Sequence, residues 1–150
     1  MFFGETAINL DAKGRLAVPV RYRQDLLEQC ENRMVLTYSA FDSGSLWLYP
    51  EHTWEGVRNQ VMALPNLNPR HRSLQRRLVG SATAVTPDGS GRILLPPSLR
   101  QVTSLEKRVV MLGMGNRFEI WNENTLNQKR IEEEGSMSDQ ASEEMSSLVF

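Results

Sequence analysis

The sequence predicts a mixed α+β fold built from two copies of one unit. Two stretches carry this prediction, "DAKGRLAVPVRYR" at residues 11–23 and "DGSGRILLPPSLR" at residues 88–100. They align at a constant offset, and such self-similarity indicates an internal repeat. Five positions are identical: Asp11, Gly14, Arg15, Pro19 and Arg23 match Asp88, Gly91, Arg92, Pro96 and Arg100.

Each copy begins with two short β-type runs on either side of an Asp-x-x-Gly turn. The Asp side chain can bond to the nearby backbone and glycine tolerates a positive φ, so the turn favours a tight hairpin. A proline then stands where a helix would begin. In the first copy the helix continues with apolar spacing at Tyr22, Leu26 and Leu27. We therefore expect strand, turn, strand and helix, with the arginine at a hairpin tip.

Each copy ends with a second pair of strands. In the first copy these are residues 33–39 and 45–50 around the turn "FDSG", and in the second they are residues 108–114 and 117–121 around Gly115 and Asn116. The predicted organisation is a first repeat at 1–54, a helical insert at 55–80, a second repeat at 81–126, and a C-terminal helix with a flexible acidic tail at 127–150.

The insert between the repeats has the pattern of two helices. Asn68 is a suitable cap for the second helix, and Pro69 suits its first turn. The first helix has its apolar residues near one face, namely Trp54, Val57, Val61, Met62 and Leu64. The second carries four arginines, for which a solvated face, a subunit contact and a DNA contact all stay open: Arg70, Arg72, Arg76 and Arg77.

The net charge of -1 hides an uneven distribution. Residues 1–130 carry 17 Lys and Arg against 12 Asp and Glu, whereas residues 131–150 carry six acids and no base. A basic body can attract a polyanion, although a small excess is also common on ordinary surfaces. The tail lacks periodicity and is expected to be flexible, with an apolar end at 148–150 that could dock onto the body.

The composition excludes several classes of protein. No apolar run approaches the roughly 20 residues that span a bilayer, and the N-terminus lacks the features of a secretory signal, so we expect a cytoplasmic protein. The lone Cys30 excludes an internal disulfide and a Cys-based zinc site. His52 and His71 have no partner at metal-ligand spacing, and the Gly-x-Gly at 89–91 precedes a strand instead of a helix. We expect no enzyme, no catalytic residue, no metal and no cofactor.

The chemistry that remains is that of arginine beside a turn. A guanidinium on a rigid protruding element can bond bidentately to phosphate or to a guanine edge. The alternative is that Arg15 and Arg92 pair with Asp11 and Asp88 to hold the turns together. The candidate DNA-binding residues are Lys13, Arg15, Arg21, Arg23 and Arg92.

These features resemble a known family. An Asp-x-x-Gly-Arg turn, an apolar strand, a proline and a helix resemble the SpoVT/AbrB swapped-hairpin domain. Two such units joined by a helical insert are similar to the MraZ family up to about residue 134. The segments that carry the resemblance are "MFFGE", "NLDAKGRLAVPVRYR", "RSLQRRLVGSA", "DGSGRILLPPSLR" and "NRFEIW".

The resemblance implies a pseudo-two-fold swapped-hairpin β-barrel and association of the chains into a homo-oligomeric ring. It also implies a bacterial, nucleoid-associated transcriptional regulator that binds double-stranded DNA. The sites would be short direct repeats upstream of the division and cell wall gene cluster, which includes the regulator's own gene. In such domains the basic turn faces the DNA, a role that falls here on Arg15 and Arg92, with Lys13 beside Arg15. The second copy has Ser90 and Ser98 in place of Lys13 and Arg21 and is less cationic.

Two other functions stay open. The acidic tail with its apolar end would suit an antitoxin-like or structural module that binds a partner protein. A nucleotide-using enzyme is disfavoured, because no acid, base, metal site or phosphate loop stands out.

Overall fold

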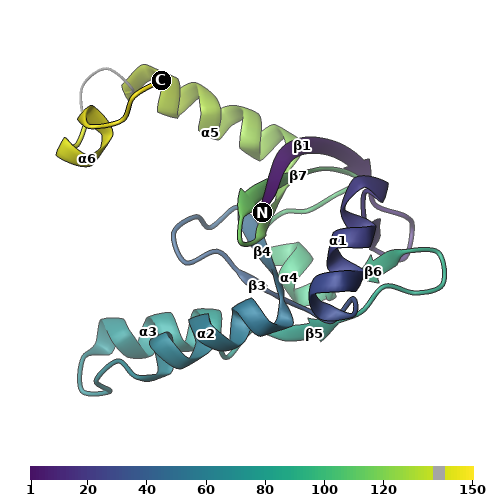
Figure 1. Ribbon diagram of the computed structural model, residues 1–150, viewed down its shortest axis with the longest axis horizontal. Coiled ribbons are helices and arrows are strands. Elements are labelled where there is room, and N and C mark those ends of the chain that lie inside the picture. Colours follow the sequence, from purple (N-terminus) through teal and green to yellow (C-terminus); the bar gives the residue numbers. More distant parts are fainter. Residues whose placement is uncertain (137–140) are drawn as a thin grey trace.

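The computed structural model describes residues 1–136 and 141–150 and has an α+β fold, with helices arranged around a mostly antiparallel sheet (Figure 1). In chain order the strands are β1 (Phe2–Asn9), β2 (Arg15–Ala17), β3 (Met34–Tyr38), β4 (Ser45–Pro50), β5 (Thr83–Val85), β6 (Arg92–Leu94), β7 (Arg108–Gly115) and β8 (Phe118–Asn122). The helices are α1 (Val20–Cys30), α2 (Glu51–Met62), α3 (Pro69–Leu78), α4 (Pro97–Val102), α5 (Glu123–Ser136) and α6 (Glu143–Ser146).

The sheets join strands from the two halves of the chain. Six strands pair in the order β1-β7-β8-β4-β3-β5, and β2 pairs with β6 in a separate two-stranded sheet. The longest ladder runs from Phe2 opposite Gly115 to Asn9 opposite Arg108. Strands of the first copy thus pair with strands of the second at β1–β7, β4–β8, β3–β5 and β2–β6.

Two expectations about the sheet were wrong. The large sheet is not closed into a barrel, since its pairing order ends at β1 and β5. The runs on either side of each Asp-x-x-Gly turn do not form a hairpin with each other. Around the first turn β1 pairs with β7 and β2 with β6, and before the second turn β5 pairs with β3. The eight-residue ladder between β1 and β7 satisfies more backbone groups than the three residues of β2 could.

The local elements agree with the sequence prediction. The hairpins β3–β4 and β7–β8 form as expected. Pro19 and Pro96 immediately precede α1 and α4. Asn68 caps α3, because its side-chain oxygen accepts a hydrogen bond from the backbone N–H of Arg70 at 2.9 Å.

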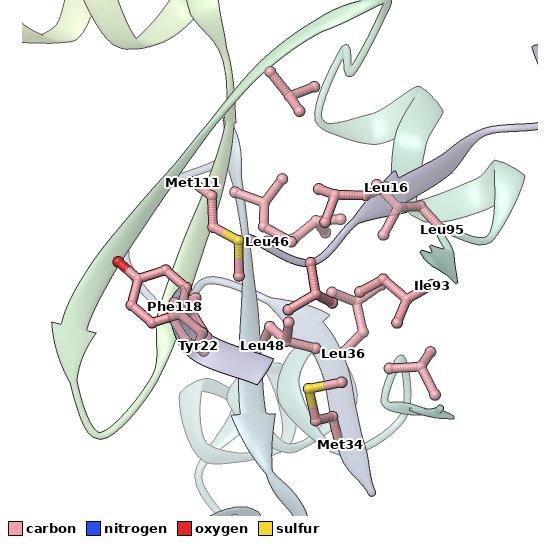
Figure 2. Close-up of a cluster of buried hydrophobic side chains, with 14 of the residues drawn as sticks. Leu16, Tyr22, Met34, Leu36, Leu46, Leu48, Ile93, Leu95, Met111 and Phe118 are labelled. Atoms are coloured by element: carbon pink, nitrogen blue, oxygen red, sulfur yellow. The ribbon is translucent and has the colours of Figure 1, made fainter. Parts of the chain in front are cut away.

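One core is shared by both copies, and Figure 2 shows part of it. Leu16 of β2 lies opposite Ile93 of β6, and both side chains are fully buried. The helical insert packs on a second apolar cluster through Trp54, Val61 and Leu78. Two residues of the apolar helical patterns noted in the sequence are about half exposed, Leu27 at 51% and Met62 at 50%.

The last residues of the chain were expected to be flexible. Residues 137–140 lie outside the described part of the structure, and α6 follows them. Leu148, Val149 and Phe150 are exposed and do not dock onto the body. Among the described residues, none of the helices has the length and apolar character needed to cross a membrane.

Candidate nucleic-acid interface

The first Asp-x-x-Gly turn is organised by the carboxylate of Asp11. Its Oδ1 accepts hydrogen bonds from the backbone N–H groups of Lys13 and Arg15, each at 2.9 Å. The backbone N–H of Gly14 donates to the Asp11 carbonyl at 3.0 Å. This is the local Asp-to-backbone bonding that the residue types predict.

The second turn repeats this arrangement. The Oδ1 of Asp88 accepts from the backbone N–H groups of Ser90 at 2.8 Å and Arg92 at 3.1 Å. Gly91 donates to the Asp88 carbonyl at 2.9 Å. The two turns therefore share the same pattern of hydrogen bonds to their aspartates from the backbone.

Pairing of β2 with β6 places the two turns next to each other. Arg15 is opposite Leu94, and Ala17 is opposite Arg92. Two further backbone hydrogen bonds cross between the copies. The N–H of Val18 donates to the Gly91 carbonyl at 2.9 Å, and the N–H of Leu95 donates to the Gly14 carbonyl at 3.0 Å. In Figure 1 the chain around β6 forms one end of the molecule, remote from α3 and α5.

The predicted arginines meet the turn aspartates. Arg15 Nε lies 2.7 Å from Asp11 Oδ2, and its Nη1 lies 3.5 Å from Asp88 Oδ2. Arg92 Nη1 lies 3.3 Å from Asp11 Oδ2. The ion pairs of Arg15 and Arg92 with the turn aspartates, the alternative to DNA contact, are thus present. Two of the three ion pairs link the two copies. Both arginine side chains stay partly exposed, at 35% and 42%, so each can contact solvent while paired.

The electrostatics keep this cluster ionised. The backbone N–H of Arg15 is the largest cause that lowers the pKa of Asp11, to about 2, and the Arg15 guanidinium and the Lys13 N–H act in the same direction. The pKa of Asp88 is also lowered, first by the backbone N–H of Arg92. Both carboxylates are charged at neutral pH and can hold the arginines in fixed orientations.

Arg23, a predicted DNA contact, has a structural role. Its Nε donates to the Val18 carbonyl at 2.9 Å, and its guanidinium lies against Gly91 of the other copy. Arg100 mirrors it: its Nε donates to the Leu95 carbonyl at 2.9 Å, and its guanidinium lies against Gly14. Arg100 was absent from the candidate set, although its alignment with Arg23 was the signal that could have identified it.

The other two candidates differ in their surroundings. Arg21 is directed onto β1, where its Nη2 donates to Thr6 Oγ1 at 2.6 Å and its guanidinium lies 4.7 Å from the centre of the Tyr22 ring. Lys13 is exposed in the first turn and forms no ion pair with any described residue. The structure therefore brings Arg15 and Arg92 together, with Lys13 in the adjoining turn, and directs Arg21 elsewhere.

The surface beside the turns is hollowed twice, in equivalent places. One hollow of about 550 Å³ lies between α1 and the second turn and includes Arg23 and Asp88. Its counterpart of about 570 Å³ includes Arg100 and Asp11. In residues 1–136 and 141–150 no cluster of three or more His, Cys, Asp or Glu side chains could hold a metal ion.

The sequence also matches known proteins. The family model described as "MraZ protein, putative antitoxin-like" matches residues 1–77 and 78–147. A relative from Stenotrophomonas maltophilia (strain R551-3), named "Transcriptional regulator MraZ", is 52% identical over 123 residues, which are 82% of this chain and 83% of the relative. A relative of the same name from Thioalkalivibrio sulfidiphilus (strain HL-EbGR7) is 49% identical over 132 residues, 88% of this chain and 87% of the relative. Both the family model and the relatives thus extend over most of the sequence, and the chain belongs to the MraZ family.

Proposed function

We propose that the chain is a DNA-binding transcriptional regulator. The observation that carries the proposal is the pair of adjacent turns that present Lys13, Arg15 and Arg92 on one surface. Relatives that are about half identical are named transcriptional regulators, which supports the same role.

The geometry suits recognition of a duplex. Asp11 and Asp88 hold the guanidinium groups of Arg15 and Arg92 in place, so less conformational entropy is lost on binding. Arg15 and Arg92 are suited to bidentate contacts with phosphate or guanine, and Lys13 to a single phosphate contact. Because Arg21 and Arg23 bond to protein groups, their contribution is to the local positive field.

A single chain offers only a small basic surface. A few phosphate contacts give dissociation constants on the order of 10⁻⁴–10⁻⁶ M at physiological salt. Linking several copies can raise the affinity by roughly 10²–10⁴. We therefore propose a homo-oligomer, a ring by family resemblance, that binds short direct repeats in the promoter of the division and cell wall gene cluster, in association with the nucleoid.

The proposed division of the chain follows the repeats. Residues 1–54 and 81–126 form the two DNA-facing units, residues 55–80 the insert, and residues 127–150 the C-terminal extension.

A second candidate function is binding of a partner protein. It is favoured by the exposed apolar end at Leu148, Val149 and Phe150, and it predicts complex formation in the absence of DNA.

The test is a binding titration on DNA that carries one, two or three direct repeats, at two salt concentrations, with light scattering for mass. We expect tandem repeats to bind far more tightly than a single repeat. A change of spacing by about half a helical turn, roughly 5 base pairs, should weaken binding, because adjacent sites then face opposite sides of the duplex. Equal affinity for all three DNAs, or tight binding by a monomer, contradicts the proposal.

A further inference from the structure

Two segments far from the turns carry unbalanced charge of opposite sign. Residues 56–87 contain five arginines and no acid, whereas residues 131–150 contain six acids and no base. The exposed arginines of α3 and the glutamates near the end of α5 form no ion pair with any described residue. The arginines are Arg70, Arg72 and Arg76, and the glutamates are Glu132, Glu133 and Glu134.

The positive charges in the first turn of α3 oppose the helix dipole, whereas those of Arg76 and Arg77 in the last turn agree with it. The first turn of the helix contains Arg70 and Arg72 and no acid, although a helix N-terminus favours negative charge. Arg72 Nη1 donates to the Asn66 carbonyl at 2.6 Å, and the side chain stays exposed. Arg77 is only partly exposed, since its Nε donates to the Ser39 carbonyl at 2.6 Å and its guanidinium lies over Tyr38. Leu67, just before the helix, is 94% exposed. This basic surface with an apolar edge would gain stability from an acidic neighbour.

The end of α5 carries unbalanced charge of the opposite sign. Its three successive glutamates at 132–134 lie near the C-terminus, where no basic residue balances them, although a helix C-terminus favours positive charge. The start of the helix is anchored by the buried Leu126 and by Arg130, which pairs with Glu5. Beyond Arg130 every described residue of the helix is exposed, including Ile131 at 65%. Helical stability in proteins comes mainly from packing, so this end lacks a partner.

We propose that the end of α5 in one copy of the chain binds the exposed arginines of α3 in a second copy. The contact would place Glu132–Glu134 against Arg70, Arg72 and Arg76, with Ile131 near Leu67. It neutralises both charge clusters and corrects both unfavourable charge–dipole arrangements. This inference deepens the self-association proposed above and does not depend on DNA binding.

The structure favours a contact between copies over one within a chain. No hydrogen bond or ion pair joins α3 to α5 or α6 among the described residues. In Figure 1, α5 and α3 project from the body toward the same side but end apart from each other. In a head-to-tail arrangement each copy would give the end of α5 to one neighbour and α3 to the other, and this contact could repeat around a ring.

Charge reversal tests the contact. One variant combines Arg70→Glu, Arg72→Glu and Arg76→Glu, and another combines Glu132→Lys, Glu133→Lys and Glu134→Lys. Each alone should weaken self-association without DNA, on the order of tenfold or more at low salt, because the attraction between the two charge clusters becomes repulsion. The variant that combines all six substitutions, called the six-fold variant, should regain self-association. An equimolar mixture of the two triple variants should also regain self-association, because the charges of α5 in one variant are opposite to those of α3 in the other.

The readouts are mass by light scattering and melting by circular dichroism. A control with Glu143→Lys and Glu144→Lys on α6 should leave the mass unchanged. Unchanged mass in the reversed variants, or no recovery in the six-fold variant, overturns the proposal. Recovery in the six-fold variant but not in the mixture also overturns it, since the contact would then lie within one chain. Binding to single-repeat DNA, measured in parallel, tests the proposed function separately.

Discussion

Arg23 lies against Gly91, and this contact joins the helix of one copy to the turn of the other. A Cβ at Gly91 would stand 2.8 Å from Arg23 Cζ, and the glycine has a φ of +76°. Arg100 and Gly14 form the equivalent contact on the opposite side, where the glycine φ is +79°. The turns are thus supported by residues that lie far away in the sequence.

Gly91→Ala should destabilise the fold. The positive φ costs about 1–2 kcal/mol for a residue with a Cβ, and Arg23 must also move. The measurement is the free energy of unfolding by urea denaturation. Gly89→Ala is the matched control, because a Cβ there meets nothing within 4 Å. Equal stability of the two variants would show that Arg23 does not restrain the turn.

Arg15→Ala should weaken DNA binding more than Arg92→Ala does. Each lost contact costs roughly 1–3 kcal/mol. Loss of Arg15 also removes the ion pair of Asp88 and one of the two of Asp11, so unneutralised carboxylates would face the phosphates. Fluorescence anisotropy with single-repeat DNA measures the effect, and Arg58→Ala, at an exposed arginine of α2, controls for net charge.

Folding of Arg15→Ala should change little, because a partly exposed ion pair contributes about 0–1 kcal/mol. Early melting of Arg15→Ala with normal DNA affinity would assign the arginine a purely structural role.

Stability should depend on Asp11 at acidic pH. Its pKa falls from 3.8 to about 2 on folding, so the folded state favours the charged carboxylate. This contribution is fully present above pH 3.8 and is lost as the pH falls toward 2. Asp11→Asn should lack this contribution. The difference in the free energy of unfolding between the variant and the original chain should therefore become smaller between pH 4 and 2. Urea titrations across this range measure the gap, and a constant gap contradicts the assignment.

Truncation after Gly135 should leave the melting temperature nearly unchanged, because residues 141–150 are exposed. The shortened chain loses three acids of the tail, Asp139, Glu143 and Glu144. Less negative charge then opposes the phosphates, so DNA binding at low salt should become slightly tighter. Scanning calorimetry and a salt titration check the two effects. A large fall in melting temperature would show that the tail packs on the body.

Residue patterns within short stretches of the chain were enough to predict the local elements. The Asp-x-x-Gly turns, the proline-led helices α1 and α4, the Asn68 cap and the two hairpins depend on contacts within a few residues, so residue type is sufficient to predict them. The duplication was also visible, because equivalent residues keep a constant spacing.

The pairing of the strands and the exposure of the cationic side chains depend on long-range contacts. A strand offers the same backbone groups to any neighbour, so the local pattern around Leu16 could not show that its partner is Ile93 and not a residue of β1. The same holds for charge: spacing cannot reveal that Arg23 supports Gly91, that Arg21 bonds Thr6, or that Arg15 joins two aspartates. The contacts of Arg23 with Gly91 and of Arg15 with Asp88 connect the two copies, and they exist only once the copies have exchanged strands.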